Sequence, residues 1–229
     1  MSLAGVPVLQ RVVDRCKRID GVDQVIVAIP EGDYNTPLEE RAEQAGAAVV
    51  RGSETDVLSR YLSALEAYPA RYVMRVTSDC PFLDPEVSGA MLKGMTDRGA
   101  DYSATAWWPH GLDSEAMTAD ALRLAGENAT NALDREHVTL WLKRAEGIKR
   151  YIHTAEQNFA STQRWVLDYA EDMAFLEALC AKLKPYPDMP GWREILAICE
   201  QNPDISAHNR MRIAEWADKN RKIIRDAAS

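Results

Sequence analysis

Short apolar segments rich in β-branched residues alternate with helical segments along the first half of the chain, and this alternation constrains the fold more than any other feature. Strands are predicted at 24–29, 47–50, 72–76 and 101–106. Apolar residues at helical spacing fill the interval between each pair of strands. Such alternation favours a mainly parallel sheet with helices on both faces and right-handed crossovers. The sequence therefore predicts an α/β fold.

Local signals predict where several helices begin. A helix opens the chain, with Pro7 at a tolerated first-turn position. Thr36 and Glu39 fit a capping box for the next helix, which reaches Gly46. Asp84 stands just before a proline and an apolar-periodic stretch, so N-capping explains this residue adequately.

The alternation weakens after Trp107. An extended segment is expected at 111–117, helices at 118–125 and 131–144, strands at 149–153 and 164–167, and helices from Glu171 to the end. We divide the chain into an α/β domain at 1–177 and a helical tail at 178–229, packed on the same domain. No linker is long enough to separate two independent domains.

Composition limits the classes of protein to consider. The chain has 229 residues, 46% of them hydrophobic and 27% charged, with a net charge of −8. No window approaches the roughly 18 to 20 apolar residues of a membrane span. The negative charge disfavours non-specific binding to nucleic acid or to an anionic membrane. The first residues carry no export signal, so we expect a cytoplasmic protein that binds neither nucleic acid nor a membrane.

Two carboxylates follow apolar strands at their predicted carboxyl ends. Asp79 comes after the strand at 72–76, and Asp168 after the strand at 164–167. Ligands of open α/β sheets bind at this edge, and Mg²⁺ takes one or two carboxylates together with waters and phosphates. An Asp after a strand can equally be a turn former, and both interpretations of Asp79 stay open. For Glu171 and Asp172 we prefer a first-turn helix role.

Five sequence blocks occur in one order along the chain: RGSETDVLSRY at 51–61, DCP at 79–81, GLDSE at 111–115, REHVT at 135–139 and WVLDYAED at 165–172. Together they resemble the spore coat polysaccharide biosynthesis protein F group of cytidylyltransferase-like proteins, relatives of the enzymes that make CMP-sugars. The resemblance implies a Rossmann-like nucleotidyltransferase fold. It also implies a magnesium-dependent enzyme of bacterial polysaccharide biosynthesis that joins CTP, or another nucleoside triphosphate, to a sugar or sugar acid and releases pyrophosphate. Relatives often work as homodimers, so we expect one here.

The same resemblance implies roles for particular residues. Asp79 and Asp168 would be the catalytic, metal-binding pair. The candidate substrate-binding residues are Arg51, Ser53, Asp56, Asp113, Glu115, Arg135 and His137. A purely structural role stays open for most of these residues. Ser53 and Asp56 also look like caps of the helix at Val57, which we prefer, and His137 fits a surface edge of its helix.

One block of the family pattern is not found. The group usually has a strand and a glycine- and arginine-containing loop, which wraps the nucleotide phosphates, before the helix that starts here at Pro7. Three explanations stay open: an N-terminally truncated chain, which we prefer, a loop supplied by another chain, or lost transferase activity. As given, the chain would lack a strand of the sheet and leave a sheet edge unpaired. The alternative function is a catalytically degenerate module that binds a nucleotide-sugar.

Overall fold

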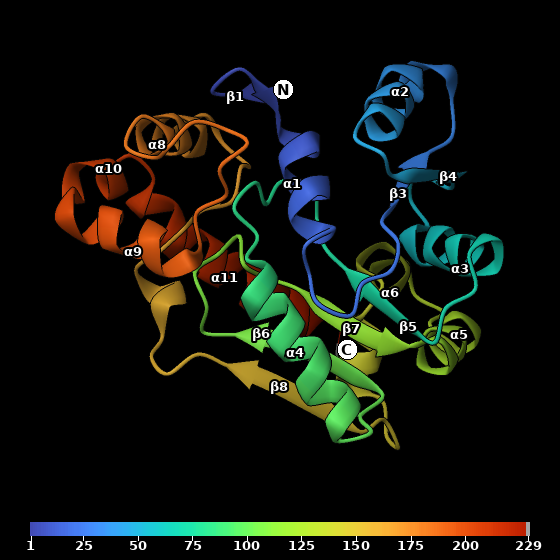
Figure 1. The fold of residues 1–229 in the computed structure, drawn as a ribbon. Coiled ribbons are helices and arrows are strands. Elements are labelled where there is room, and N and C mark those ends of the chain that lie inside the picture. The colour runs from blue at the N-terminus through green and yellow to red at the C-terminus, as the bar shows by residue number, and fades with distance from the viewer. Residues whose placement is uncertain (228–229) are drawn as a thin grey trace.

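The protein is described by a computed structural model that covers residues 1–227 (Figure 1). Its strands, in chain order, are β1 (Ser2–Leu3), β2 (Val6–Pro7), β3 (Ile26–Pro30), β4 (Ala48–Gly52), β5 (Tyr72–Arg75), β6 (Tyr102–Ala106), β7 (Glu115–Thr118) and β8 (Arg150–Thr154). They form three separate sheets, in the orders β1-β2, β3-β4 and β5-β7-β6-β8. The predicted α/β class is confirmed.

The larger sheet is mixed. Strand β6 pairs with β8 in parallel, and β3 pairs with β4 in parallel. Strand β7 lies between β5 and β6 and is antiparallel to both. Strand β7 overlaps the segment at 111–117 that was predicted to be extended. This segment reverses direction after β6 and adds an antiparallel strand to the sheet. This return explains why the larger sheet departs from the mainly parallel arrangement that the alternation favours.

Eleven α-helices and two short 3₁₀ helices are present within residues 1–227. They are α1 (Val8–Cys16), η1 (Asp33–Asn35), α2 (Thr36–Gln44), α3 (Val57–Ala67), α4 (Pro85–Asp97), α5 (Ala119–Asn128), α6 (Ala132–His137), α7 (Leu140–Arg144), η2 (Phe159–Ser161), α8 (Ala170–Cys180), α9 (Trp192–Gln201), α10 (Pro203–Ala207) and α11 (Arg210–Ala227). None of these helices is long and apolar enough to cross a lipid bilayer.

Helices α1 and α3 each pack against both β3 and β5. On α1, Val13 packs with Val27 of β3, while Cys16 packs in a cluster with Met74 of β5. Helix α3 contacts β3 and β4, and its Leu58 shares a cluster with Val73 of β5. Because neighbouring side chains of a strand point to opposite faces, Val73 and Met74 place α3 and α1 on opposite faces of the sheet.

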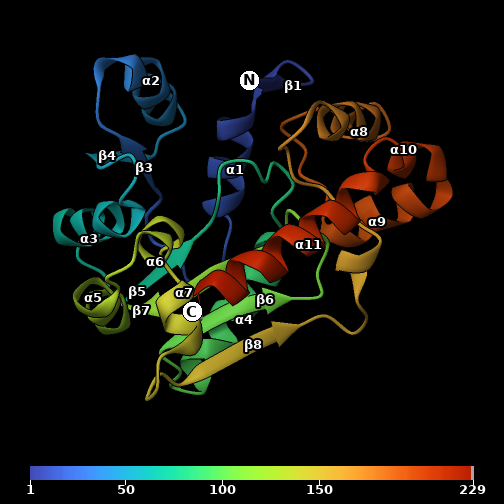
Figure 2. The same ribbon diagram turned by 180° about the vertical axis from the view of Figure 1, so that it is seen from behind.

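The C-terminal helices extend the core at one end of the molecule. Residues of α8, α9 and α10 pack in one hydrophobic cluster with Leu3, Phe82 and the fully buried Trp165. Helix α11 then runs along the back of the molecule from beside α9 toward α7 (Figure 2). Its Trp216 lies against His110, with ring centroids 3.6 Å apart.

The predicted capping box at the start of α2 is wrong. Asn35 occupies the N-cap position, and no side chain caps this helix. The carboxylate of Glu39 instead accepts from Nε of Arg51, at 3.2 Å, and pairs with the same guanidinium through Nη2. The positive charge of the guanidinium attracts the Glu39 carboxylate more strongly than an uncharged backbone amide does.

The single helix predicted at 131–144 is two helices. Val138 has a φ of +63°, which ends α6, and α7 begins at Leu140. This backbone is costly for a β-branched residue, yet the Val138 side chain is fully buried in the cluster beneath α5. Burial of an apolar side chain offsets the local strain, and periodicity alone does not show that.

The strand predicted at 164–167 is also wrong, because the segment has two partners rather than one. Arg164 forms an isolated parallel bridge with His110. Trp165 N donates to His110 O at 2.6 Å, and Leu167 N donates to Asp79 O at 2.9 Å. The segment therefore connects the two loops that follow β6 and β5, and it extends no sheet.

Candidate active site

The segments that carry the two predicted metal-binding aspartates adjoin in space, although 89 positions separate Asp79 and Asp168 in the sequence. Asp79 lies in the loop after β5, and Asp168 in the turn before α8. The hydrogen bond from Leu167 N to Asp79 O, 2.9 Å long, joins these two segments one residue before Asp168. The backbone therefore presents both carboxylates from adjoining turns.

Each of the two carboxylates keeps one oxygen without a hydrogen-bond donor among residues 1–227. Oδ1 of Asp79 accepts from the Thr77 hydroxyl and, at 3.3 Å, from Sγ of Cys80, while no donor contacts Oδ2. Oδ2 of Asp168 accepts from Arg164 Nη2 at 2.7 Å, and Oδ1 has no donor. The Asp168 side chain is 41% exposed. Each carboxylate therefore has one oxygen that can accept a further ligand.

Cys80 supports Asp79 as a neutral thiol. Its side chain is buried, and burial together with the charge of Asp79 raises the pKa of the Cys80 thiol. A thiol with a raised pKa keeps its proton and can donate it to the carboxylate. The contact therefore orients Asp79 without competing with it for a cation.

A buried ion pair fixes the turn that carries Asp168. Asp172 is fully buried, and its Oδ1 and Oδ2 accept from Nε and Nη2 of Arg164 at 2.8 and 2.7 Å. Burial alone would raise the Asp172 pKa, but hydrogen bonds from Arg164 and Asn209 lower it. Asp172 also accepts the backbone N–H of Asp168 at 3.0 Å. The preferred helix-start role of Asp172 is confirmed, and its effect is to hold Asp168 in place.

Asp113 belongs to a third turn at this edge. The bridge between His110 and Arg164 brings the loop after β6 against the segment that leads to Asp168. Gly111 has a φ of +102°, and an added Cβ would lie 2.7 Å from the backbone of Trp165, so only glycine fits this approach. The Asp113 side chain is 56% exposed. It faces solvent and is available to a ligand.

This edge of the sheet offers two carboxylates to a metal ion and not a complete set of protein ligands. Among the residues that the structure describes, no group of three or more His, Cys, Asp or Glu side chains has the geometry to hold a metal ion. Magnesium is commonly held by one or two carboxylates, with waters and substrate phosphates completing its six ligands. The free oxygens of Asp79 and Asp168 fit this mode of binding.

Glu115 is not available to bind sugar hydroxyls as expected. Only 8% of the residue is exposed, and both carboxylate oxygens have protein partners. Oε2 pairs with Arg75 at 2.9 Å, and Oε1 pairs with Lys143 at 2.9 Å and accepts from Tyr102 and Thr139. The face of β7 that carries Glu115 is covered, so this carboxylate is not open to a substrate.

Electrostatics keep Glu115 charged. Burial alone would raise its pKa, but Lys143, Arg75 and the Tyr102 hydroxyl lower the Glu115 pKa to about 2. Burial and the Glu115 charge raise the pKa of Tyr102, which therefore stays protonated and donates. The sequence analysis did not single out Arg75, Tyr102 or Lys143. The signal for Arg75 is its register opposite Glu115 in the β5–β7 pair, which requires knowing that β7 returns to the sheet.

Four other predicted substrate-binding residues, Arg51, Ser53, Asp56 and Arg135, have partners within the protein. Asp56 caps α3 by accepting Ser59 N at 2.9 Å, and Ser53 Oγ accepts Asp56 N at 3.0 Å. The structural role preferred for both residues is present. Oδ2 of Asp56 also accepts from Nε of Arg135 at 2.6 Å, although 79 positions separate them. Arg51 is likewise bound by Glu39.

His137 is half-buried at the C-terminal end of α6, next to the strained Val138. His137 and Arg135 lie on α6, which packs against α3. The structure thus joins the segments of Asp79 and Asp168 and places the turn of Asp113 beside the same segment. It engages Arg51, Asp56, Glu115 and Arg135 in internal ion pairs.

Comparison with known proteins identifies the family. The family profile described as Cytidylyltransferase matches residues 1–205. The chain belongs to the cytidylyltransferase family. It is 30% identical over 185 residues to the spore coat polysaccharide biosynthesis protein SpsF of Bacillus subtilis, covering 80% of this chain and 77% of that protein. It is 27% identical to a 3-deoxy-manno-octulosonate cytidylyltransferase of Anaeromyxobacter, covering 94% of this chain and 80% of the relative.

Solved structures show the same fold across the family. A cytidylyltransferase from Leptospira borgpetersenii superposes with a TM-score of 0.83 at 23% identity, covering 90% of this chain and 87% of the other. A CMP:2-keto-3-deoxy-manno-octonic acid synthetase complexed with CTP superposes with a TM-score of 0.53 at 16% identity, covering 68% and 82%. The expected nucleotidyltransferase fold of this family member is therefore confirmed.

Proposed function

We propose that this protein transfers the cytidylyl group of CTP to a sugar or sugar acid, using a divalent metal ion held by Asp79 and Asp168. The observation that carries the proposal is the Leu167–Asp79 hydrogen bond, which brings the two acidic turns together. Family membership supports the nucleotide chemistry. SpsF and the 3-deoxy-manno-octulosonate cytidylyltransferase, by their names, support an acceptor from polysaccharide biosynthesis.

The proposed reaction is a substitution at the α-phosphorus of CTP. A hydroxyl oxygen of the sugar forms a new bond to this phosphorus and loses its proton, while the bond to the β-phosphate oxygen breaks and pyrophosphate leaves. Charge on the phosphate oxygens must be neutralised and the hydroxyl held in line. A divalent ion supplies both effects when bound, and it makes a coordinated hydroxyl easier to deprotonate.

The chain's own residues position the ion and the acceptor. Thr77 and Cys80 orient Asp79, and the buried Arg164–Asp172 pair orients Asp168. Asp113, exposed at the adjoining turn, is placed to accept hydrogen bonds from sugar hydroxyls. We propose Mg²⁺ as the ion, since oxygen ligands and phosphates suit it. A structural neighbour, Rv0371C of Mycobacterium tuberculosis, has been solved in complex with manganese, with a TM-score of 0.51.

The setting of the reaction is part of the proposal. We place the protein in the bacterial cytoplasm, where CTP is available, and expect it to act as a homodimer that sedimentation would detect. We also retain the division into an α/β domain at 1–177 and a helical tail at 178–229. The shared cluster of Phe82, Trp165 and Ile195 is consistent with a tail that packs on the domain.

Pyrophosphate release tests the transfer. The protein is incubated with Mg²⁺, a 3-deoxy-sugar acid and each of CTP, UTP, ATP and GTP. Release with CTP is expected, and Asp79→Asn should lower the rate on the order of 10²–10³-fold. Asp97→Asn, which alters an exposed acid paired with Lys93 on α4, is the matched control and should leave the rate unchanged.

A binding module is the second candidate, and the internal pairing of Arg51 and Arg135 favours it, since those guanidinium groups are engaged by protein carboxylates. Tight binding of a CMP-sugar with no pyrophosphate release from any triphosphate would support this module. The same result would contradict the proposed transfer.

A further inference from the structure

The C-terminal helix α11 begins beyond the part of the chain that the family profile matches. The profile ends at residue 205, and α11 spans Arg210–Ala227. Figure 2 shows this helix along the back of the molecule, between α9 and α7. Its first turns nevertheless contact the segments that carry Asp168 and Asp113, two acidic residues of the candidate site.

Asn209, immediately before α11, makes the first of these contacts. Only 2% of the residue is exposed. Its Nδ2 donates to Arg164 O at 3.0 Å and to Oδ1 of Asp172 at 2.9 Å. A primary amide has two N–H bonds, so both donors are used on the two residues that hold Asp168. A serine at this position, with a single O–H, could not make both bonds.

Arg212, in the first turn of α11, makes the second contact. Its Nη2 donates to Oε1 of Glu171 at 2.9 Å. Its guanidinium carbon lies 4.1 Å from the centroid of the Tyr169 ring, and a cation over an aromatic face is attracted to it. Tyr169 directly follows Asp168 in the chain. Arg212 therefore ties α11 to the start of α8, beside the Asp168 carboxylate.

Trp216, in the second turn, makes the third contact. Its ring lies against His110, with ring centroids 3.6 Å apart. His110 precedes Asp113 in the loop after β6 and forms the parallel bridge with Arg164. The Trp216 ring therefore supports the loop that carries the third acidic residue of the site.

The three contact residues lie on one side of α11. Asn209, Arg212 and Trp216 are three and four positions apart, which is the spacing of neighbours on one helix face. The same side of the helix therefore reaches the turn of Asp168 and the turn of Asp113. One rigid element supports both segments of the site.

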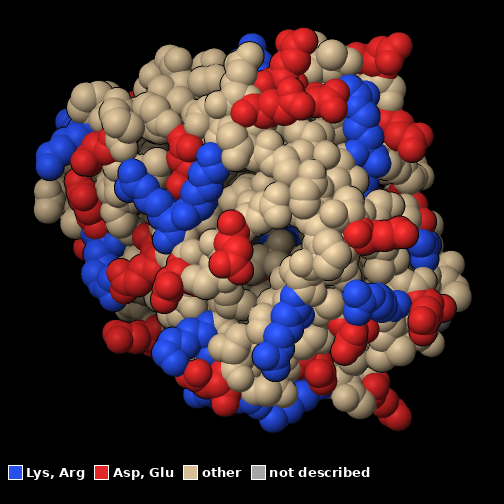
Figure 3. Space-filling view, turned by 45° about the vertical axis from the view of Figure 1, so that its right-hand side comes forward, with Lys and Arg blue, Asp and Glu red and all other residues tan. Residues whose placement is uncertain are grey.

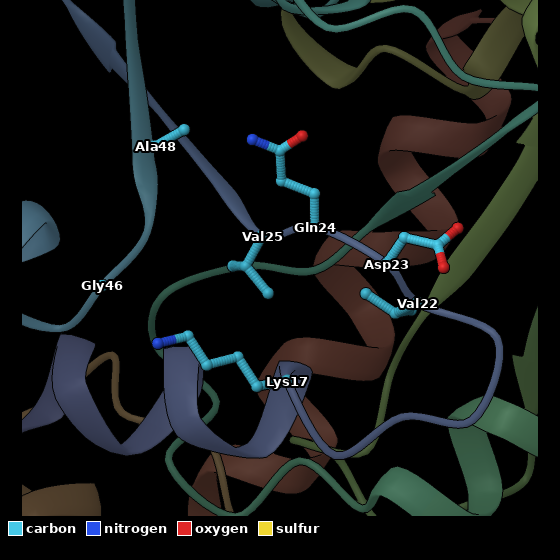
Figure 4. A pocket seen from close by; sticks show the side chains of 7 residues that line it. All are labelled: Lys17, Val22, Asp23, Gln24, Val25, Gly46 and Ala48. Atoms are coloured by element: carbon cyan, nitrogen blue, oxygen red, sulfur yellow. The ribbon is translucent and has the colours of Figure 1, made fainter.

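A cavity elsewhere in the molecule has no part in this arrangement. It has a volume of about 300 Å³ and lies between the end of α1 and the starts of β3 and β4 (Figure 4). All of its lining residues fall between Lys17 and Ala48, so neither α8 nor α11 contributes to it. An effect of α11 on metal binding would therefore act through the acidic turns.

We propose that α11 positions the metal-binding carboxylate of Asp168, with Asn209 as the positioning residue. Asn209 holds Asp172, which accepts the backbone N–H of Asp168. Asp172 also pairs with Arg164, whose Nη2 donates to Oδ2 of Asp168. Without Asn209 this turn would shift and misdirect the free Oδ1 of Asp168. The inference rests on the proposed metal role of Asp168.

The affinity for Mn²⁺ in the presence of CTP tests the positioning role. Asn209→Ala should raise the Kd for Mn²⁺ about tenfold, the lower end of what the loss of a group that orients a metal ligand costs. Asn202→Ala is the matched control. Asn202 lies in the same helical tail and donates from Nδ2 to Ile198 O at 2.8 Å, away from Arg164 and Asp172 in its bonding, so this variant should keep the wild-type Kd.

A double-variant cycle separates positioning from a general loss of stability. If Asn209 acts through Asp168, Asn209→Ala should weaken Mn²⁺ binding little further once Asp168→Asn is present. Losses that simply add would overturn the inference. Wild-type affinity in Asp168→Asn would remove the proposed metal role, and the inference with it. Weakened binding in Asp168→Asn beside unchanged binding in Asn209→Ala would overturn the inference alone.

Amide hydrogen exchange followed by NMR gives a readout that needs no metal. The N–H groups of Asp168 and Tyr169 both donate to Oδ2 of Asp172 at 3.0 Å. In Asn209→Ala these two amides should exchange at least about fivefold faster, while the amides of β6 and β8 keep their wild-type rates. Equal acceleration at the strand amides would indicate a general loss of stability and would overturn the positioning role.

Arg212→Gln tests the same role from a partly exposed position and decides the question if Asn209→Ala does not fold. It should raise the Kd for Mn²⁺ about threefold. Arg193→Gln is the control, because Arg193 also pairs with a carboxylate, Glu86 at 2.9 Å, and lies over a ring, Trp192 at 4.5 Å. Acidic and basic side chains are interspersed on the face that Figure 3 shows, so one lost charge changes the potential little. Equal Kd values in the two variants would overturn the proposal.

Discussion

Glu115, Asp79 and Asp168 are all carboxylates that the sequence predicts as site residues, yet their burial and their hydrogen-bond partners differ. Every oxygen of Glu115 has a protein partner, and the group is buried beneath Arg75 and Lys143. Asp79 and Asp168 are each held through one oxygen and keep the other open. The difference shows that a carboxylate at the end of a strand is a ligand candidate only when its own hydrogen bonds leave an oxygen free.

The comparison predicts that removing Glu115 damages the fold. Glu115→Ala leaves the mostly buried Arg75 guanidinium without its partner, and removing one member of a buried ion pair costs about 3–5 kcal/mol of unfolding free energy. Urea unfolding followed by circular dichroism measures this change. A loss below about 1 kcal/mol would mean that water already solvates Arg75, and the contrast with Asp79 would fail.

Acid sensitivity sharpens the same contrast. The folded-state pKa of Glu115, about 2, lies below its usual value of 4.5, so the stabilisation it provides is fully present above about pH 4.5 and is lost as the pH falls toward 2. The expected size is about 3 kcal/mol. The unfolding free energies of wild type and Glu115→Gln should therefore approach each other as the pH falls from 5 to 2. A constant difference across this range would contradict the lowered pKa.

Asp56 should give a smaller effect. It caps α3 and pairs with a partly exposed Arg135. Loss of an N-cap costs about 1 kcal/mol, and a partly exposed ion pair adds a few tenths. Asp56→Ala is expected to lower the free energy of unfolding by about 1–2 kcal/mol. Asp120→Ala, an exposed first-turn acid on α5, is the control and should change it by less than about 0.5 kcal/mol.

Much of the fold follows from local patterns in the sequence. Asp56 and Asp84 cap their helices as predicted, because an Asp followed by an apolar-periodic stretch satisfies the free N–H groups of the first turn. The strands at 72–76 and 101–106 were placed within a residue or two. These features depend on neighbours in sequence, which a pattern records directly.

The errors come from contacts between distant segments. Arg51 draws Glu39 away from a capping box, burial of Val138 splits a helix, and His110 and Asp79 share the backbone groups of 164–167. In the site, the resemblance pointed to Asp79 and Asp168, whose segments are joined by the hydrogen bond from Leu167 N to Asp79 O. It also pointed to Glu115, whose partners Arg75 and Lys143 are separated from it by 40 and 28 positions in the sequence and could not be paired with it beforehand.

Metal binding by single and double variants tests the central claim most directly. Mn²⁺ affinity in the presence of CTP is measured by calorimetry for wild type, Asp79→Asn, Asp168→Asn and the double variant. If both carboxylates hold one ion, each single variant should lose most of the affinity, and the double variant should lose little more than either. Wild-type affinity in either single variant, or losses that simply add, would contradict a shared metal ion.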